Sequence, residues 1–158
     1  MKNKIFLIIF FFIIFHNQSL SEPLRFESAE IEIKENGNKV IAKNGKAITQ
    51  NDSIEIEAEN FEYSKTSKVL KAFNGSALLK LDNIKIDFDS LIYDEKNFII
   101  TANDNVKIFD FKKDLTITTD LIIFDQKKNL IKSDKRSTLI DKINNILNTE
   151  TFEYDLKK

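Results

Sequence analysis

Acidic side chains are the residues of this chain whose chemistry could be used directly. Glu55, Glu57, Glu59, Asp87 and Asp89 occupy alternate positions in two segments rich in apolar residues. Two carboxylates about 5–10 Å apart across a cleft could hydrolyse a glycosidic bond. Here the acids alternate with apolar residues, and this spacing places them on the opposite face of a β-sheet. We therefore expect a solvated face. A small β-rich hydrolase acting on envelope polysaccharide is the alternative hypothesis for these acids.

Metal and nucleophile chemistry have few candidates. Asp94 and Asp125 lie in acidic turns, but these turns lack the dense, glycine-punctuated ligand spacing of a calcium loop. The single histidine, His16, lies in an apolar N-terminal segment, which argues against a histidine base or a zinc site in the mature domain. The chain has no cysteine and therefore no disulfide or thiol nucleophile. We expect no catalytic residues, no metal site and no cofactor.

The N-terminal segment predicts export. Lys2 and Lys4 precede an apolar run over residues 5–15, and small residues follow up to Ser21. Because a membrane-spanning helix needs roughly 20 apolar residues, we expect residues 1–21 to be a cleaved signal peptide. An uncleaved anchor and a buried helix are the alternatives. Cleavage would leave 22 basic and 25 acidic residues, a net charge of about −3 that does not favour binding to nucleic acid.

The elements that position these side chains are predicted to be β-strands, because apolar residues recur at every second position. In residues 84–102, apolar residues alternate up to Phe88 and resume one residue out of phase at Leu91. The same shift separates Ala58 from Phe61. Alternation predicts a half-buried strand, and a change of phase within it predicts a bulge or a bend.

The pattern repeats in units of about 30 residues, as expected of a repeat architecture. The residues that close each alternating stretch lie 30, 30, 31 and 30 positions apart, and they are Ile33, Tyr63, Tyr93, Phe124 and Tyr154. Short polar connections follow at residues 35–38, 64–67, 94–97 and 125–129. Short connections favour antiparallel neighbours. The sequence therefore predicts one all-β domain over residues 22–158, an antiparallel meander or roll.

Two local features complete this prediction. Gly45, Gly75 and Asn105 occupy equivalent places, and since these residue types tolerate positive φ, we predict a tight turn at each that opens the next strand. The last unit is irregular, because the apolar spacing within residues 138–147 fits a helix at least as well as a strand. Both alternatives stay open there, and residues 151–154 are expected to form a final strand.

The apolar positions of the strands would form one continuous inner surface. This surface is either an ordinary packed core or the lining of an open roll that admits lipid. Its expected members are Ile54, Ile56, Phe61, Tyr63, Ile84, Ile86, Phe88, Leu91, Tyr93, Ile117, Leu121 and Phe124.

Three short segments resemble a known family. Residues 23–28 (PLRFES) look like its opening strand, and residues 58–63 (AENFEY) and 89–94 (DSLIYD) look like its repeated phrases. The chain thus resembles the OstA-like (LptA family) periplasmic domain of lipopolysaccharide export, found as LptA, LptC and the N-terminal domain of LptD. The resemblance covers essentially residues 22–158, and its specificity comes from the order and spacing of the copies.

The resemblance implies a twisted, open antiparallel β-jellyroll in the periplasm that carries lipid A acyl chains from the inner to the outer membrane without catalysis. It also implies partners: lipopolysaccharide, LptC-like and LptD-like components joined through edge strands, and further copies arranged head to tail. By motif match, the groove-lining positions include Leu24, Phe26, Leu79 and Tyr93.

The chain stops at Lys158 without an outer-membrane barrel, which favours an LptA-like protein or a detached N-terminal module of LptD. The sequence does not separate these two. A second hypothesis is an assembly module that docks on an LptD-like barrel or an inner-membrane partner without carrying lipid itself.

Overall fold

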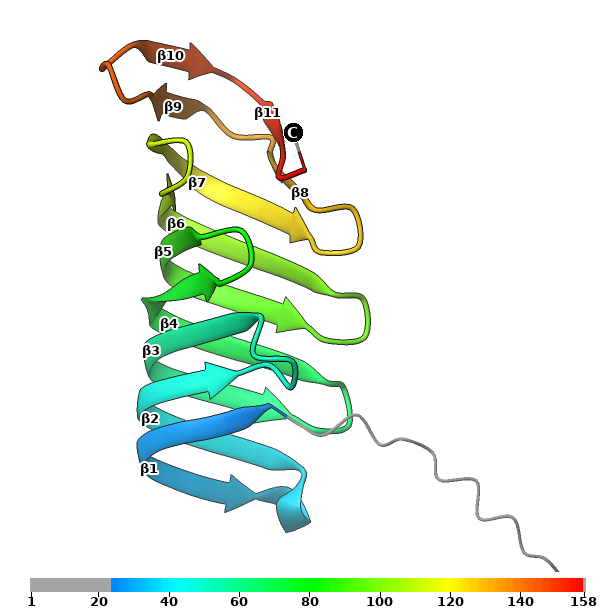
Figure 1. Ribbon diagram of the computed structural model, residues 1–158. Coiled ribbons are helices and arrows are strands. Elements are labelled where there is room, and N and C mark those ends of the chain that lie inside the picture. The colour runs from blue at the N-terminus through cyan, green and yellow to red at the C-terminus, as the bar shows by residue number, and fades with distance from the viewer. Residues whose placement is uncertain (1–23, 158) are drawn as a thin grey trace, which may run out of the picture.

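The computed structural model describes residues 24–157, and these residues form one antiparallel sheet of 11 strands. Figure 1 shows the strands stacked in chain order along one axis, and each long strand curves at one side of the molecule. The predicted all-β class, an open antiparallel jellyroll, is confirmed. The predicted signal peptide, residues 1–21, lies outside the described residues. Residues 24–157 contain no helix that is long and apolar enough to cross a membrane.

Consecutive strands pair as hairpins in the order β1 to β8, followed by β11, while β9 pairs with both β7 and β10. The first hairpin contains a short 3-10 turn, η1 (Glu35–Gly37). The strands are β1 (Arg25–Lys34), β2 (Lys39–Ile48), β3 (Ile54–Ser64), β4 (Val69–Leu79), β5 (Ile84–Asp94), β6 (Ile99–Asp110), β7 (Leu115–Asp125), β8 (Leu130–Ser133), β9 (Ser137–Ile140), β10 (Ile146–Thr149) and β11 (Phe152–Asp155).

Each long strand bends near its middle, as the change of phase predicts. In β5, burial alternates up to Phe88, skips the pair Asp89 and Ser90, and resumes at Leu91. The register between β5 and β6 shifts between Asp87 and Ser90, so the strands do not form a flat ladder there. In β3 the burial pattern skips Glu59 and Asn60 in the same way. The burial pattern thus supports the predicted bend in both strands, but only β5 has a register shift, since β3 keeps one register with β2 and with β4.

The predicted tight turns at Gly45, Gly75 and Asn105 are wrong, because all three residues lie inside continuous strands. Positive φ does occur at these places, but it belongs to Asn44, to Asn74 and to Asp104 with Asn105. At Gly75 the missing side chain matters for another reason. A Cβ built there would lie 2.1 Å from the backbone oxygen of Glu57, so glycine permits the close approach of β3 and β4 at the bend.

The bends fold the sheet into two layers that share one hydrophobic core. The apolar residues before and after each bend belong to a single buried cluster. At one end, Phe26 of β1 packs against Phe61 and Tyr63 of β3, with ring centroids 5.9 and 6.0 Å apart. These two contacts join the first half of β1 to the second half of β3, and therefore one layer to the other.

The turns form two continuous lips, one along the free margin of each layer. The first lip consists of the turns at residues 49–53, 80–83 and 111–114, and the second of the turns at 65–68, 95–98 and 126–129. Successive turns are joined by backbone hydrogen bonds. On the second lip, Glu95 N donates to Lys68 O (3.0 Å) and Gln126 N donates to Phe98 O (3.1 Å). Each lip is thereby fixed along its length.

The irregular last unit continues the two layers, but each of its bent strands is divided into two short strands. Residues 138–147 form most of β9 and the start of β10, with a turn between them, so the strand alternative is the correct one. Together β8 and β9 replace one bent strand, and β10 and β11 replace the next. The final strand expected at residues 151–154 is β11, Phe152–Asp155.

Candidate lipid-binding interior

The predicted groove-lining residues converge on the space between the two layers. All of them except Phe26 are less than 7% exposed, and Phe26 is partly buried against the same cluster. They are Leu24, Phe26, Ile54, Ile56, Phe61, Tyr63, Leu79, Ile84, Ile86, Phe88, Leu91, Tyr93, Ile117 and Phe124. The inner surface is therefore continuous, and its side chains fill it as a packed core.

One expected member of the inner surface is placed elsewhere. Leu121 lies at the bend of β7 and is only half-buried, and its neighbour Ile122 takes the inward position instead. Leu121 borders an outer hollow of about 460 Å³ together with Phe152 of β11. The prediction for Leu121 is wrong because the phase shift falls between Thr119 and Ile122, two residues earlier than the expected shift between Leu121 and Phe124.

The interior reaches the surface where the two lips face each other. A cavity of about 770 Å³, here called the seam cavity, lies between the turn at residues 49–53 and the turn at 95–98. Of the predicted groove residues, Leu24 and Tyr93 line it. A smaller cavity of about 180 Å³ adjoins it, because Asn51, Ser53 and Gln126 line both.

The smaller cavity continues along the seam between the turns at residues 80–83 and 126–129, and Leu81, Asp82 and Asn129 also line it. Its apolar wall includes Ile54, Leu79 and Phe124, which are three further predicted groove residues. Five of the fourteen predicted residues therefore line a cavity between the lips, while the others lie deeper in the packed core.

Two tyrosines of the repeat contact polar residues of the second lip. Burial raises the pKa of the Tyr63 phenol above its ordinary value, and the neighbouring Glu95 carboxyl adds to the rise. Burial also raises the pKa of Glu95, against the opposing effects of Tyr63 and Lys68. Burial likewise raises the pKa of Tyr93, opposed by Gln126. Glu95 and Gln126 are equivalent residues, since each follows the aspartate that ends a strand.

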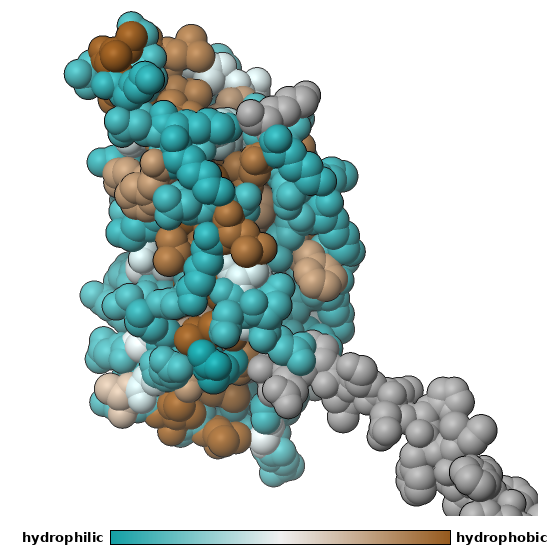
Figure 2. Space-filling view, viewed as in Figure 1, coloured by the Kyte–Doolittle hydropathy of each residue, from teal (hydrophilic) through white to brown (hydrophobic). Residues whose placement is uncertain are grey.

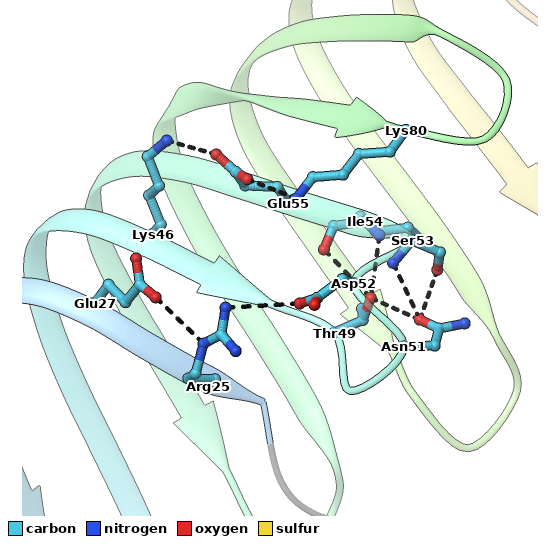
Figure 3. A network of polar contacts seen from close by, with 10 residues as sticks. All are labelled: Arg25, Glu27, Lys46, Thr49, Asn51, Asp52, Ser53, Ile54, Glu55 and Lys80. Carbon is cyan, nitrogen blue, oxygen red and sulfur yellow. Dashed lines mark hydrogen bonds and ion pairs between the residues drawn. The ribbon is translucent and has the colours of Figure 1, made fainter.

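The acidic residues at alternate positions lie on the outer face, as expected. Glu55 accepts ion pairs from Lys46 (2.5 Å) and Lys80 (2.9 Å) across neighbouring strands, as Figure 3 shows. These two lysines lower the pKa of Glu55 below its ordinary value. Glu57, Glu59 and Asp89 are exposed, and Asp87 is half-exposed beside Lys85 at 2.9 Å. The Glu55 pairs therefore cross between neighbouring strands, whereas the pair of Asp87 with Lys85 lies within β5.

A hydrogen bond closes the seam at the C-terminal end. The Tyr154 hydroxyl of β11 donates to Asp110 Oδ2 at the end of β6, and these strand segments belong to opposite layers. The backbone N–H groups of Lys112 and Lys113 donate to Asp110 Oδ1 at 2.8 and 3.0 Å. Burial alone would raise the pKa of Asp110, but Tyr154 and the two N–H groups outweigh it and lower that pKa.

We predict that Tyr154→Phe lowers the free energy of unfolding at pH 7 by about 1.5–3 kcal/mol, the range for hydrogen bonds to charged groups. Because the pKa of Asp110 is lower in the folded state, its ionised form contributes stability above its ordinary pKa of 3.8. That contribution is lost as the pH falls below 3.8 through the folded-state pKa. Urea unfolding at several pH values measures both effects. An equal difference between wild type and variant at pH 7 and at pH 2 would contradict this role of the hydrogen bond.

Both ends of the roll expose apolar side chains, and Figure 2 shows hydrophobic surface at each end. At the first end, Ile31 and Ile33 of β1 are 50% and 62% exposed, although their partners Ala42 and Val40 in β2 are buried. At the other end, Leu147 of β10 is 59% exposed opposite half-buried Leu139. Since β1 pairs only with β2, and β11 only with β8, both edges present unpaired backbone groups.

The structure adds core and seam residues that the sequence pattern did not single out. The inward positions of β6 and β8, including Ile100, Ile108 and Ile131, belong to the same core and follow the same alternation with a phase shift. Glu95, Gln126 and Asp110 were not predicted because polar turn residues look alike in sequence. The available signal was position, because Glu95 and Gln126 directly follow a strand and Asp110 is the last residue of one. No group of His, Cys, Asp and Glu within residues 24–157 is suited to hold a metal ion.

The bent, open antiparallel sheet, folded around one apolar core, defines the class of this fold as an LptA-like β-jellyroll. A solved structure with this fold is LptH from Pseudomonas aeruginosa, described as the LptA homologous periplasmic component of the conserved lipopolysaccharide transport device. The TM-score is 0.56 at 14% sequence identity, and the match covers 66% of this chain and 76% of that one. No family model and no curated relative matches the sequence.

Proposed function

We propose that this chain is a non-enzymatic periplasmic protein that binds the acyl chains of lipopolysaccharide between its two layers and hands them on toward the outer membrane. The observation that carries the proposal is the continuous apolar interior that runs through all the repeated units and reaches the surface at the seam cavity. The fold of LptH supports the same role.

Shielding acyl chains from water requires a long apolar surface. Each methylene contributes about 0.8 kcal/mol, so a chain of about 12 carbons needs roughly 10 kcal/mol of shielding outside a bilayer. The packed interior supplies apolar contacts of this kind only if the layers separate along the seam. The lips face each other there without forming a sheet, whereas the bent strands hold the opposite side together. Lipid entry would therefore widen the seam and leave the bends in place.

The two exposed edges suit the proposed transfer between molecules. A second copy, or a related component, can add its edge strand to β1 or to β10 and β11, which covers Ile31, Ile33 and Leu147. The two ends are different surfaces, so such contacts need not close into a ring and can extend into a bridge. Further copies and LptC-like and LptD-like proteins are the proposed partners.

Lipid that co-purifies with the full chain tests this function. We expect mass spectrometry of protein isolated from its native envelope to detect bound lipopolysaccharide, with at least a fivefold loss in Tyr93→Ala, which removes a ring from the seam cavity wall. Asp87→Ala, on the outer face of the same strand, is the matched control and should retain lipid. Equal retention in the two variants would argue against a lipid-lined interior.

A second candidate is a docking module that carries no lipid, and the packed interior specifically favours it. In this case both exposed ends serve assembly with a barrel or an inner-membrane protein. The same purification separates the candidates, because wild-type protein that retains its protein partners but no lipopolysaccharide supports docking alone.

A further inference from the structure

The seam cavity contains polar atoms that an acyl-chain interior does not need. Glu95 Oε1 and Gln126 Nε2 are both buried without a partner in hydrogen-bonding geometry, although the Tyr63 hydroxyl interacts with the Glu95 side chain and the Tyr93 hydroxyl with the Gln126 side chain. Buried polar atoms in folded proteins are nearly always paired, since an unpaired one costs about 1–3 kcal/mol. Both residues line the seam cavity, and one of the two atoms is an acceptor while the other is a donor.

Both side chains are held by ordered turns of the second lip. Asp94 Oδ1 accepts the Asn97 N–H (3.1 Å), and Asp125 Oδ1 accepts the Lys128 N–H (3.1 Å), so each turn is fixed by the aspartate before Glu95 or Gln126. The backbone bond from Gln126 N to Phe98 O joins the two turns. The unpaired acceptor and donor are therefore presented from one preorganised edge.

The cavity wall also carries positive charge. Lys68 and Lys96 line it, and neither forms a salt bridge within residues 24–157. Lys96 Nζ donates to the backbone oxygen of Thr66 at 3.2 Å, which leaves two of its donor positions for another acceptor. The lining therefore contains two lysines and a single acid, Glu95, whose carboxyl interacts with Lys68. This wall suits an anionic group.

Apolar residues border the polar ones. Leu24 and Tyr93 line the cavity and are buried, while Phe98 lines it with 45% of its surface exposed. Phe98 has φ +61°, an unfavourable conformation for a bulky residue that is found where the surroundings impose it. Ile54, Leu79 and Phe124 of the core border the adjoining cavity, so apolar surface lies next to the polar wall.

We propose that the seam cavity binds the polar headgroup of the cargo, an acylated and phosphorylated sugar. Hydroxyl and amide groups of the sugar pair with Glu95 Oε1 and Gln126 Nε2, and a phosphate lies against Lys68 and Lys96. The first methylenes of the acyl chains contact Leu24, Tyr93 and Phe98. A volume of about 770 Å³ lies within the range of small-molecule sites. The inference rests on the proposed function and adds the position and chemistry of the headgroup site.

The test compares the binding of diphosphorylated lipid A with that of its dephosphorylated form, both in the same detergent, by the full chain and its variants. We expect Lys68→Gln to weaken binding of the phosphorylated lipid at least fivefold and to leave the dephosphorylated lipid nearly unaffected. Lys71→Gln makes the same charge change at an exposed site of β4 and is the control. Gln126→Leu should weaken both lipids at least fivefold, since it removes a donor to the sugar.

Thermal unfolding separates loss of binding from loss of fold. Because Gln126 Nε2 has no partner in hydrogen-bonding geometry and interacts only with the Tyr93 hydroxyl, Gln126→Leu should change the melting temperature little while binding falls. Wild-type binding of both lipids with no change in the Lys68 and Gln126 variants would overturn the headgroup site and leave the proposed function standing. If wild type binds neither lipid, the headgroup site and the proposed function both fail.

Discussion

Ile86→Ala is expected to lower the free energy of unfolding by about 2–5 kcal/mol, as other large-to-small core substitutions do. Ile86 has no exposed surface and lies in the middle of the sheet, between Ala77 of β4 and Ile108 of β6. The backbone of β5 and of its neighbours β4 and β6 holds each layer in place, so the two layers can collapse only partly around the lost methylenes. Chemical unfolding monitored by circular dichroism measures the loss.

The neighbouring residues provide the controls. Ile86→Val removes a single methylene and should cost about 0.5–1.5 kcal/mol. Asp87→Ala changes a half-exposed carboxylate of the outer face and breaks its ion pair with Lys85, which is worth about 0–1 kcal/mol at a surface. If Ile86→Ala cost no more than Asp87→Ala, the interior of the isolated protein would be loosely filled, and an open groove would describe it better than a packed core.

Gly75→Ala is expected to destabilise the protein by about 1–3 kcal/mol or more, the cost of inserting atoms into a close-packed site. The new Cβ would lie 2.1 Å from Glu57 O and 2.8 Å from the Cα and Cβ of Ala58. The Glu57 oxygen belongs to the backbone of β3 and cannot turn aside as a side chain could. The bend must therefore open, which weakens the pairing of β4 with β3.

Ser76→Ala is the matched control for this bend. Ser76 follows Gly75 in β4, pairs with Glu57 and already carries a Cβ, so its change to alanine adds no volume. We expect it to alter the unfolding free energy by less than about 0.5 kcal/mol, as surface substitutions do. A Gly75→Ala protein as stable as Ser76→Ala would show that β3 and β4 lie further apart at the bend than described here.

The fold was predictable because its periodicities are simple. Alternation with a phase shift at Phe88 and Leu91 reports both the strand and its bend, and the 30-residue spacing of Tyr63 and Tyr93 reports the repeat. The glycine turns were not predictable in this way. Asn74 has a positive φ within a strand, and the residue types that adopt positive φ there are the same ones that adopt it in hairpin turns. The sequence therefore cannot separate a bend in a strand from a reversal of the chain.

For the site, the sequence pattern could predict only which side chains point inward. Alternation shows that Ile54 and Tyr93 point inward, but the distance to the opposite layer depends on how sharply each strand bends, and no single segment encodes that. Glu95 and Gln126 resemble ordinary polar turn residues. Their burial arises from the stacking of turns that are far apart in the sequence.

Hydrogen bonds join each turn to the next, so the repeated units stack in a fixed order. The length of the molecule is therefore proportional to the number of units. Each unit of about 30 residues adds two strands, and at about 4.8 Å per strand this corresponds to roughly 10 Å along the stacking axis. Because every unit presents the same bend and the same pair of turns to its neighbour, whole units can be gained or lost by gene duplication or deletion without changing the cross-section. The reach of one molecule can then evolve independently of the width of its interior, and the near-constant spacing of Tyr63, Tyr93, Phe124 and Tyr154 is the trace that such growth would leave.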